Sequence, residues 1–203
     1  MFAVDKPRGV ASVPSPNIGE DQTIQGSVRY WMKAGNKDYK SYLLNRLDRD
    51  TSGIILFGKY PRDREALEGI FKDQKAEKTY LALVKGTPKF HSSTISFPIE
   101  TRGADSKTTL VPAVTHYTVL KKLGILSMLE VKIETGRKHQ IRKHLAMIDH
   151  PLVLDKIYGD AKFNRTYLKL SEGAGRYFLH TWKFKFHHPL LNKDVEISAF
   201  TRF

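Results

Sequence analysis

The chain has 203 residues, of which 40% are hydrophobic and 11% aromatic, so it can bury a core and is not globally disordered. Its 34 Lys and Arg exceed its 21 Asp and Glu by 13, as is typical of proteins that meet a polyanion, although a generally basic surface would give the same count. The lack of cysteine excludes disulfides, Cys-ligated zinc and thiol catalysis. No apolar run approaches about 18 residues and no secretory signal is seen, so we expect a cytoplasmic protein with no membrane segment.

The apolar pattern of the first half predicts short strands, helices and long loops. We first expect a strand at Phe2–Val4, ended by the turn Lys6-Pro7-Arg8-Gly9, and then a helix near Ile24–Lys33 within the loop-rich stretch 11–45. A buried strand at Ile54–Phe57 follows, and then a helix opened by Pro61, with Leu67, Ile70 and Phe71 on one face. The last element of this half is a buried strand at Thr79–Val84. Residues 86–112 contain many Gly, Pro, Ser and Thr residues and are expected to form a long excursion of the kind that often serves function.

The second half predicts two hairpins and a helix. The first hairpin consists of the strands Val114–Lys121 and Leu126–Glu134 around Gly124, and a helix is expected at Arg137–Ile148. In the last hairpin, Trp182, Phe184 and Phe186 alternate on the first strand and His187–Lys193 form the turn. Val195, Ile197 and Ala199 alternate on the second strand. Hairpins with interspersed helices indicate an α+β fold, and we expect one domain over residues 1–203.

The densest polar cluster is the run from Asn45 to Gly53, which precedes a buried strand. Asp48 lies there between Arg46 and Arg49, which favour its ionised form and keep it a competent nucleophile. A solvated turn with local ion pairs is the competing interpretation.

The second polar cluster runs from Glu134 to His144, at the end of a strand and the start of a helix. Helix N-termini attract phosphate, and Lys138 and Arg142 are four residues apart on one helix face, as a patch that follows a nucleic-acid backbone requires. An ordinary amphipathic helix with a basic face fits equally. His139 and His144 are five apart rather than four, so no metal site is expected. Tyr80 by itself fits a core aromatic of a buried strand.

Together these segments resemble the RluA family of pseudouridine synthases. The matching segments, in order, are Lys6 to Gly9 for K-P-x-G, Asn45 to Gly53 for H-R-L-D-x-x-T-S-G, Lys78 to Val84 for K-x-Y-x-A-x-V, Thr135 to His144 for T-G-R-x-H-Q-I-R-x-H, His150 to Leu152 with Asp155, Tyr158 and Gly159, and Leu179 to Thr181 for L-H-x. The chain departs from the family pattern at Asn45, where His is usual, and at Leu154, where Gly is usual.

The resemblance implies an α+β catalytic domain with a mixed, largely antiparallel sheet, flanking helices and a central cleft. It implies conversion of a specific uridine in RNA to pseudouridine, with Asp48 as the essential aspartate, Tyr80 stacking on the base, and Arg137 pairing with the aspartate. The RNA contacts that it implies are made by Arg46, which fills the gap left by the flipped base, and by Thr51, Lys138, His139, Gln140, Arg142 and Leu179.

The same resemblance implies the protein's partners. An isomerisation needs no cofactor, and no metal ligand is expected. The substrate is tRNA or rRNA, with similarity to the TruC branch favouring tRNA slightly. We also expect a monomer without an N-terminal S4 domain. Two alternatives remain: a non-catalytic RNA-binding domain on the same scaffold, and a nuclease whose metal ions are held by Asp48, Asp50, Asp155 and Asp160.

Overall fold

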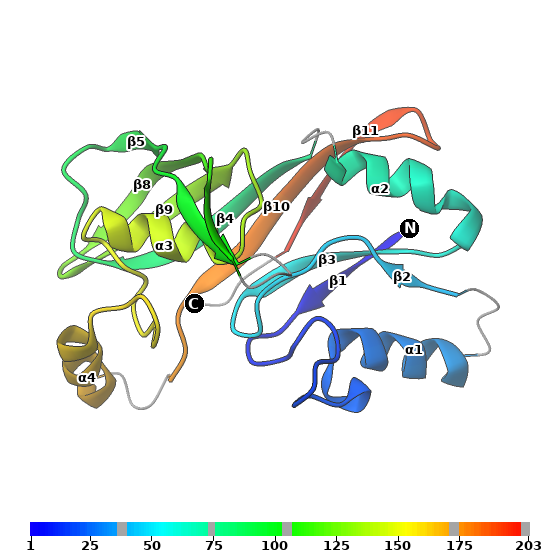
Figure 1. Ribbon diagram of the computed structural model, residues 1–203, viewed down its shortest axis with the longest axis horizontal. Coiled ribbons are helices and arrows are strands. Elements are labelled where there is room, and N and C mark those ends of the chain that lie inside the picture. Colours follow the sequence, from blue (N-terminus) through cyan, green and yellow to red (C-terminus); the bar gives the residue numbers. More distant parts are fainter. Residues whose placement is uncertain (36–39, 73–75, 103–106, 171–174, 200–203) are drawn as a thin grey trace. The chain divides into compact units, whose positions relative to one another are not determined.

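The computed structural model describes residues 1–35, 40–72, 76–102, 107–170 and 175–199 (Figure 1). It contains two compact units. Unit 1 comprises Met1–Lys78 and His180–Phe203, and unit 2 comprises Thr79–Leu179. The chain passes from unit 1 to unit 2 within strand β4 (Glu77–Lys85) and returns within strand β10 (Leu179–His188).

Unit 1 is built around one buried strand. Its elements are β1 (Phe2–Lys6), a 3-10 helix (Glu20–Gln22), α1 (Ile24–Ala34), β2 (Tyr42–Leu43), β3 (Ser52–Gly58), a 3-10 helix (Pro61–Asp63), α2 (Arg64–Lys72), β10 from His180 onward, and β11 (Lys193–Ser198). Strands β1 and β2 pair antiparallel with β3, and β11 pairs antiparallel with β10. Strand β10 runs parallel to β3.

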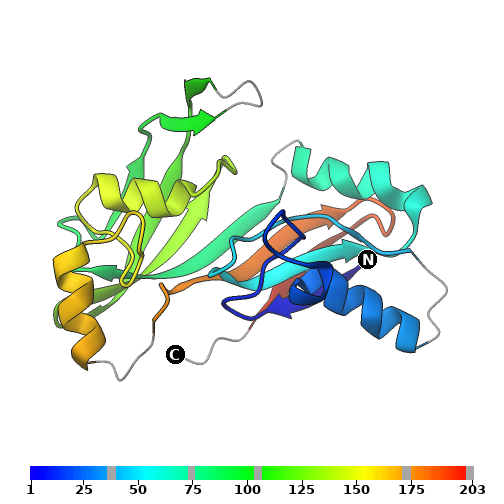
Figure 2. The same ribbon diagram turned by 60° about the horizontal axis from the view of Figure 1, so that its bottom comes forward.

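Strand β3 is apolar at consecutive positions because both of its faces are covered. Ile54 and Leu56 pack with Leu67 of α2, whereas Ile55 and Phe57 pack with Val28 of α1. Successive strand residues point to opposite faces, so one helix lies on each side of β3 (Figure 2). The strand is thereby fixed directly after the predicted aspartate loop.

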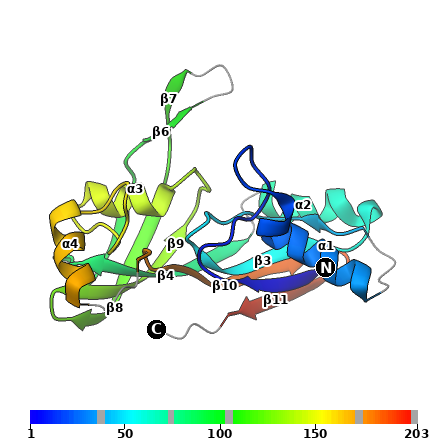
Figure 3. The same cartoon turned by 90° about the horizontal axis from the view of Figure 1, so that it is seen from below.

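Unit 2 contains four antiparallel strands in the order β4-β9-β8-β5. Besides β4, the described elements of this unit are β5 (Ser92–Ile95), β6 (Ile99–Arg102), β7 (Thr108–Val111), β8 (Thr115–Leu123), β9 (Leu126–Ile133), α3 (Gln140–Met147) and α4 (Ala161–Leu170). Strands β6 and β7 form a separate hairpin that extends beyond α3 (Figure 3).

The α+β class with largely antiparallel strands is confirmed, and the expected strands and the helices α1 and α2 are present within a few residues of their expected bounds. In the described residues no helix is long and apolar enough to cross a membrane.

Several features differ from expectation, among them the short strand β2 in the stretch that was expected to be loop-rich. The excursion over residues 86–112 contains the strands β5, β6 and β7, and helix α4 was not predicted. Helix α3 begins at Gln140 rather than at Arg137, because His139 adopts a left-handed conformation (φ 57°) that is incompatible with an α-helix.

Candidate active site

The loop that carries Asp48 lies in unit 1 and is anchored on both sides of the aspartate. The Leu47 amide donates to Ser12 Oγ (3.0 Å), and the same hydroxyl donates to the Leu47 carbonyl (2.7 Å). The Gly9 amide donates to the Arg49 carbonyl (2.8 Å), and Arg49 Nε donates to the Gly9 carbonyl (3.0 Å). Asp48, which is half-buried, lies between these two residues, whose backbone groups are fixed by the hydrogen bonds.

Lys6 supplies a third anchor from the interior. Its side chain is fully buried, and its ammonium donates to the carbonyls of Pro7 (2.9 Å), Val10 (2.8 Å) and Arg49 (3.0 Å). Three carbonyl acceptors satisfy the three N–H donors of an ammonium, which a buried charge requires. The lysine of the Lys6-Pro7-Arg8-Gly9 motif thus binds the first turn of the chain to the aspartate loop.

Asn45, where the family usually has His, fastens the start of the same loop to β3. Its Oδ1 accepts from the Leu56 amide (2.7 Å) and its Nδ2 donates to the Ile54 carbonyl (3.2 Å). A carboxamide presents a donor and an acceptor side by side, so it bridges two backbone groups of the strand. This departure from the family pattern therefore has a structural role.

The end of the loop leads into a close contact between β3 and β10. Gly53 has φ +105°, and a Cβ there would lie 2.3 Å from the Thr181 carbonyl oxygen, so only glycine fits. His180 Nε2 donates to the Ala199 carbonyl (3.4 Å), which leaves Nδ1 to accept from Ser52 Oγ (2.9 Å). Burial lowers the pKa of His180, which keeps its imidazole neutral and this bond pattern intact.

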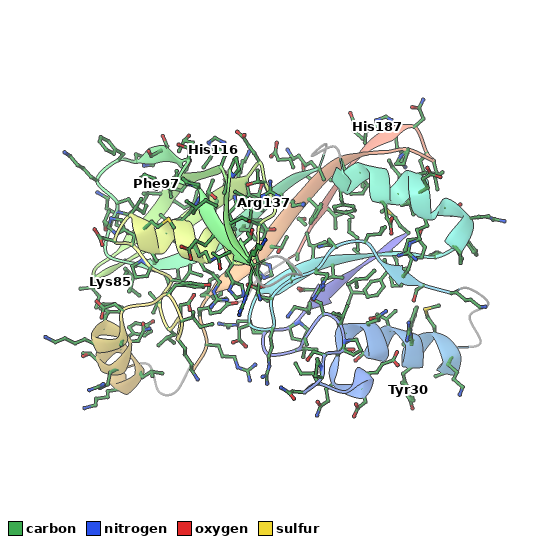
Figure 4. All side chains as sticks on the ribbon, viewed as in Figure 1. Tyr30, Lys85, Phe97, His116, Arg137 and His187 are labelled. Carbon is green, nitrogen blue, oxygen red and sulfur yellow. The ribbon has the colours of Figure 1, made fainter. Side chains whose placement is uncertain are left out.

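Arg137 lies in unit 2, in the turn that leads from β9 into α3 (Figure 4). Its side chain is exposed, and its Nε donates to the Pro112 carbonyl (3.3 Å). Gln140 Oε1 accepts from the Arg137 amide (3.1 Å) and from Thr135 Oγ1 (2.7 Å), while Gln140 Nε2 donates to the Val114 carbonyl (2.9 Å). The buried Gln140 side chain therefore fixes the backbone from which Arg137 projects.

The same network continues beneath α3. Thr115 Oγ1 accepts from Gln140 Nε2 (3.0 Å) and lies 2.9 Å from His144 Nδ1. His144 Nε2 donates to the Phe97 carbonyl (2.9 Å), so Nδ1 of the neutral ring accepts from the Thr115 hydroxyl. Burial lowers the pKa of His144, which favours this neutral form.

Arg142 forms a buried ion pair rather than an exposed basic patch. It is 4% exposed, and its Nε and Nη2 donate to the two carboxylate oxygens of Asp155 (2.7 and 2.9 Å). Its guanidinium also faces the rings of Tyr158 and Tyr177. Burial acts to raise the pKa of Asp155, but the hydrogen bonds from Arg142 and from the amides of Ile157 and Tyr158 outweigh it, so the net pKa is lowered.

The other residues expected to contact RNA differ in exposure. Arg46 and Lys138 are exposed. His139 is half-buried, and its Nδ1 lies 3.1 Å from the Tyr158 hydroxyl. Thr51, Gln140 and Leu179 are buried, at 2%, 3% and 4% exposed, and their contact with RNA stays a prediction. Tyr80 lies in β4 opposite Val131 and is 8% exposed.

The carboxylates considered for a nuclease have other partners where the structure shows them. Asp155 is paired with Arg142, and Asp160 pairs with Lys85 (2.5 Å) and accepts from the Phe163 amide (2.9 Å) at the start of α4. Across the described ranges, no group of three or more His, Cys, Asp or Glu side chains is placed to hold a metal ion.

The profile of the RNA pseudouridylate synthase family matches residues 1–147. The chain therefore belongs to this family, which confirms the resemblance found from the sequence.

Known proteins similar to this chain carry names of the same family. The uncharacterized RNA pseudouridine synthase YhcT of Bacillus subtilis is 32% identical over 206 residues, which cover 98% of this chain and 65% of that protein. Ribosomal large subunit pseudouridine synthase C of Escherichia coli is 32% identical over 164 residues, which cover 77% of this chain and 51% of that protein. This chain thus spans about half to two thirds of the length of these relatives.

A solved human structure shares the fold. RNA Pseudouridylate Synthase Domain Containing 1 superposes with a TM-score of 0.78 at 23% identity, over 98% of this chain and 79% of that one.

Proposed function

We propose that this protein is an RNA pseudouridine synthase that uses Asp48 as its nucleophile. In the reaction, the bond between uracil N1 and ribose C1′ breaks, a bond between C5 and C1′ forms, the proton of C5 leaves, and N1 ends protonated. No atom is gained or lost and nothing is oxidised or reduced. The protein must therefore hold, rotate and deprotonate a base, and it needs no consumed co-reactant.

The observation that carries the proposal is the anchoring of the aspartate loop. Backbone bonds hold Leu47 and Arg49 on either side of Asp48, and Lys6 ties Arg49 to the interior. A nucleophile has to be held close to its productive geometry, because misplacement by about 1 Å can cost a factor of 100 in rate. An ordinary solvated turn has no need of a fully buried ammonium.

We assign Tyr80 and Arg137 to the same uridine. The Tyr80 ring offers a flat face for a detached uracil and a phenol that can take part in proton removal. Arg137 is assigned as the basic residue that pairs with the aspartate, as the family resemblance implies, and a guanidinium does not give up its own proton. Gln140 fixes the backbone from which that guanidinium projects.

The proposed substrate is a folded RNA, either tRNA or rRNA. Extruding a uridine from a stack costs a few kcal/mol, and phosphate contacts of a protein with a net charge of +13 can offset this cost. We assign the exposed Arg46 and Lys138 to contacts with that RNA. Similarity to the TruC branch favours tRNA, whereas the Escherichia coli relative is named for the ribosomal large subunit. Action as a monomer in the cytoplasm is part of this proposal.

We expect Asp48→Asn to abolish pseudouridine formation, because the amide cannot act as a nucleophile, while RNA affinity changes less than about threefold. The measurement is a map of pseudouridine sites in total RNA incubated with the wild-type or variant protein, together with filter binding. Asp63→Asn, a carboxylate in the 3-10 helix before α2, is the matched control. Undiminished modification by Asp48→Asn would remove Asp48 from the mechanism.

The same assay separates the two alternatives. A binding-only domain retains RNA affinity but yields no new pseudouridine with the wild-type chain. A metal-dependent nuclease cuts the RNA and loses activity in excess EDTA, whereas a synthase leaves the strand intact and is insensitive to EDTA.

A further inference from the structure

A recess in the surface of unit 2 lies at the end of helix α3, beside strand β5. Its volume is about 350 Å³, within the range of small-ligand pockets. It is lined by Pro88, Lys89, Phe90, Ser93, Thr94, Ile95, Ser96, Phe97, Tyr117, Ile148 and His150. We call it the β5 groove.

Two exposed aromatic rings belong to this groove. Phe90 is 60% and Phe97 54% exposed, and Lys89 lies 5.6 Å above the Phe90 ring. Stacking on exposed aromatic rings is how proteins hold unpaired bases of any sequence. The Lys89 ammonium over the Phe90 ring brings to the groove a positive charge that can pair with a nucleotide phosphate.

The remaining lining residues suit the same ligand. Ser93 and Ser96 supply hydroxyls that can bond to the edges of a base, whereas the Thr94 hydroxyl is bonded to His116 Nδ1 (2.8 Å). The described lining contains no carboxylate that would repel a phosphate. We propose that the β5 groove binds one unpaired nucleobase of the substrate RNA. This inference rests on the proposed function, which makes RNA the ligand.

The groove is joined to the candidate active site through hydrogen bonds within unit 2. The Phe97 carbonyl accepts from His144, which bonds to Thr115, which in turn accepts from Gln140. Gln140 holds the Arg137 amide. A base stacked on Phe97 therefore orders the segment to which this network is fastened and helps to set the register of the RNA.

Another hollow of unit 2 provides a contrast. A cavity of about 300 Å³ is lined by Lys85, Ile125, Asp160, Lys162, Phe163, Thr166 and Tyr167. There the Lys85 ammonium is already paired with Asp160, whose carboxylate repels phosphate. This cavity is therefore the matched control site for the β5 groove.

The experiment uses the full chain in the Asp48→Asn background, so that binding is measured without turnover. The probes are a short single-stranded oligouridylate containing 4-thiouridine and a fully paired RNA duplex of the same length. The variants are Phe90→Ala and Phe97→Ala, alone and combined. Ile125→Ala, which shortens an exposed side chain of the other cavity, is the control, and Phe97→Tyr keeps the stacking ring.

We expect the double variant to bind the single strand about tenfold more weakly, which is the order of one lost base–aromatic stack. Duplex affinity, the Ile125→Ala control and Phe97→Tyr should match the parent protein. Photo-crosslinks of 4-thiouridine should map to residues 88–97. The truncated side chains are exposed, so unfolding temperatures should agree within a few degrees.

Equal affinity of the double variant and the parent for the single strand overturns the inference. So does self-association of the protein that the double variant abolishes in sedimentation, because the occupant is then a second copy of the chain. If the wild-type protein forms pseudouridine but either of these outcomes is found, only the inference about the β5 groove fails. If it forms none in any RNA, the proposed function fails and the inference falls with it.

Discussion

Lys6 and Asn45 hold the loop around Asp48 with bonds to the backbone. Both residues were visible in the sequence, Lys6 within a motif and Asn45 as a departure from one, but neither had a role that the sequence could reveal. Their partners lie on the backbone of residues far along the chain, such as Arg49 and Leu56. Backbone acceptors leave no signature in residue types, so this part of the candidate site required coordinates.

We expect Lys6→Met to destabilise the protein by roughly 3 kcal/mol, because it removes a buried ammonium together with the three hydrogen bonds that it donates to backbone carbonyls. Pseudouridine formation should fall by more than the loss of folded protein explains, since the loop next to Asp48 loosens. Urea unfolding and single-turnover kinetics measure the two effects. Lys40→Met, which alters an exposed lysine, serves as the control. A Lys6→Met protein of unchanged stability would contradict the anchoring role of Lys6.

Leu154 departs from the family glycine, and the backbone explains what that glycine does. Its φ is +65°, a left-handed conformation that costs a bulky residue roughly 1 kcal/mol or more and costs glycine little. The side chain is buried with Val153 and Leu126, and burial of a leucine side chain contributes roughly 2 kcal/mol. The apolar contact therefore offsets the strain, and the position keeps its shape without glycine.

The turn between β9 and α3 shows where element boundaries depend on side chains. The apolar spacing of Ile141, Leu145 and Ile148 predicted the helix correctly, but its start was placed three residues early. Gln140 folds back onto the Arg137 amide, and His139 takes the left-handed conformation that ends the turn. Hydrophobic periodicity locates the buried face of a helix and does not record such caps.

We expect Gln140→Leu to lower kcat about 10- to 100-fold with little change in KM, because Arg137 loses the side chain that fixes its backbone. The leucine is close in volume, so the protein should remain folded. Steady-state kinetics on the mapped RNA make this measurement, with Gln22→Leu at an exposed position as the control. A rise in KM at constant kcat would instead assign Gln140 to RNA binding.

Helix α4 and the three short strands of the excursion were missed for different reasons. Helix α4 had a usable signal, since Asp160 precedes Phe163 and Tyr167 at helical spacing and its carboxylate accepts from the Phe163 amide at the helix start. Strands β5, β6 and β7 have four residues each and mostly exposed side chains. Such short strands carry almost no alternation, so only their pairing partners define them.

Each unit of the molecule contains a fully bonded, buried histidine, His180 in unit 1 and His144 in unit 2. Burial lowers the pKa of both rings below the ordinary value of 6.5. In the unfolded chain both histidines take up a proton as the pH falls through about 6.5, whereas in the folded protein they do not until lower pH. The folded state therefore loses stability as the pH falls below about 6.5.

We expect the free energy of unfolding to decrease by up to about 1.4 kcal/mol per pH unit for each of these histidines between pH 6.5 and 5. Urea unfolding at a series of pH values measures the slope, which His144→Gln and His180→Gln should each reduce. His187→Gln is the control, because bonding to Asp194 raises the pKa of that exposed ring and its loss cannot reduce the slope. A further decline below about pH 4 should follow as Asp155, with its lowered pKa, takes up a proton.

The discontinuity of unit 1 has a consequence for the nascent protein. The segment Thr79–Leu179 leaves the ribosome as one continuous piece, whereas the residues of unit 1 leave it in two, and β3 waits for its parallel neighbour β10 and for Phe184 and Phe186, which complete its apolar surroundings. The strand that follows Asp48 is thus finished only after His180 onward has been translated. A truncated product of translation that stops before that point would contain Asp48 but not the packed strand needed to hold it.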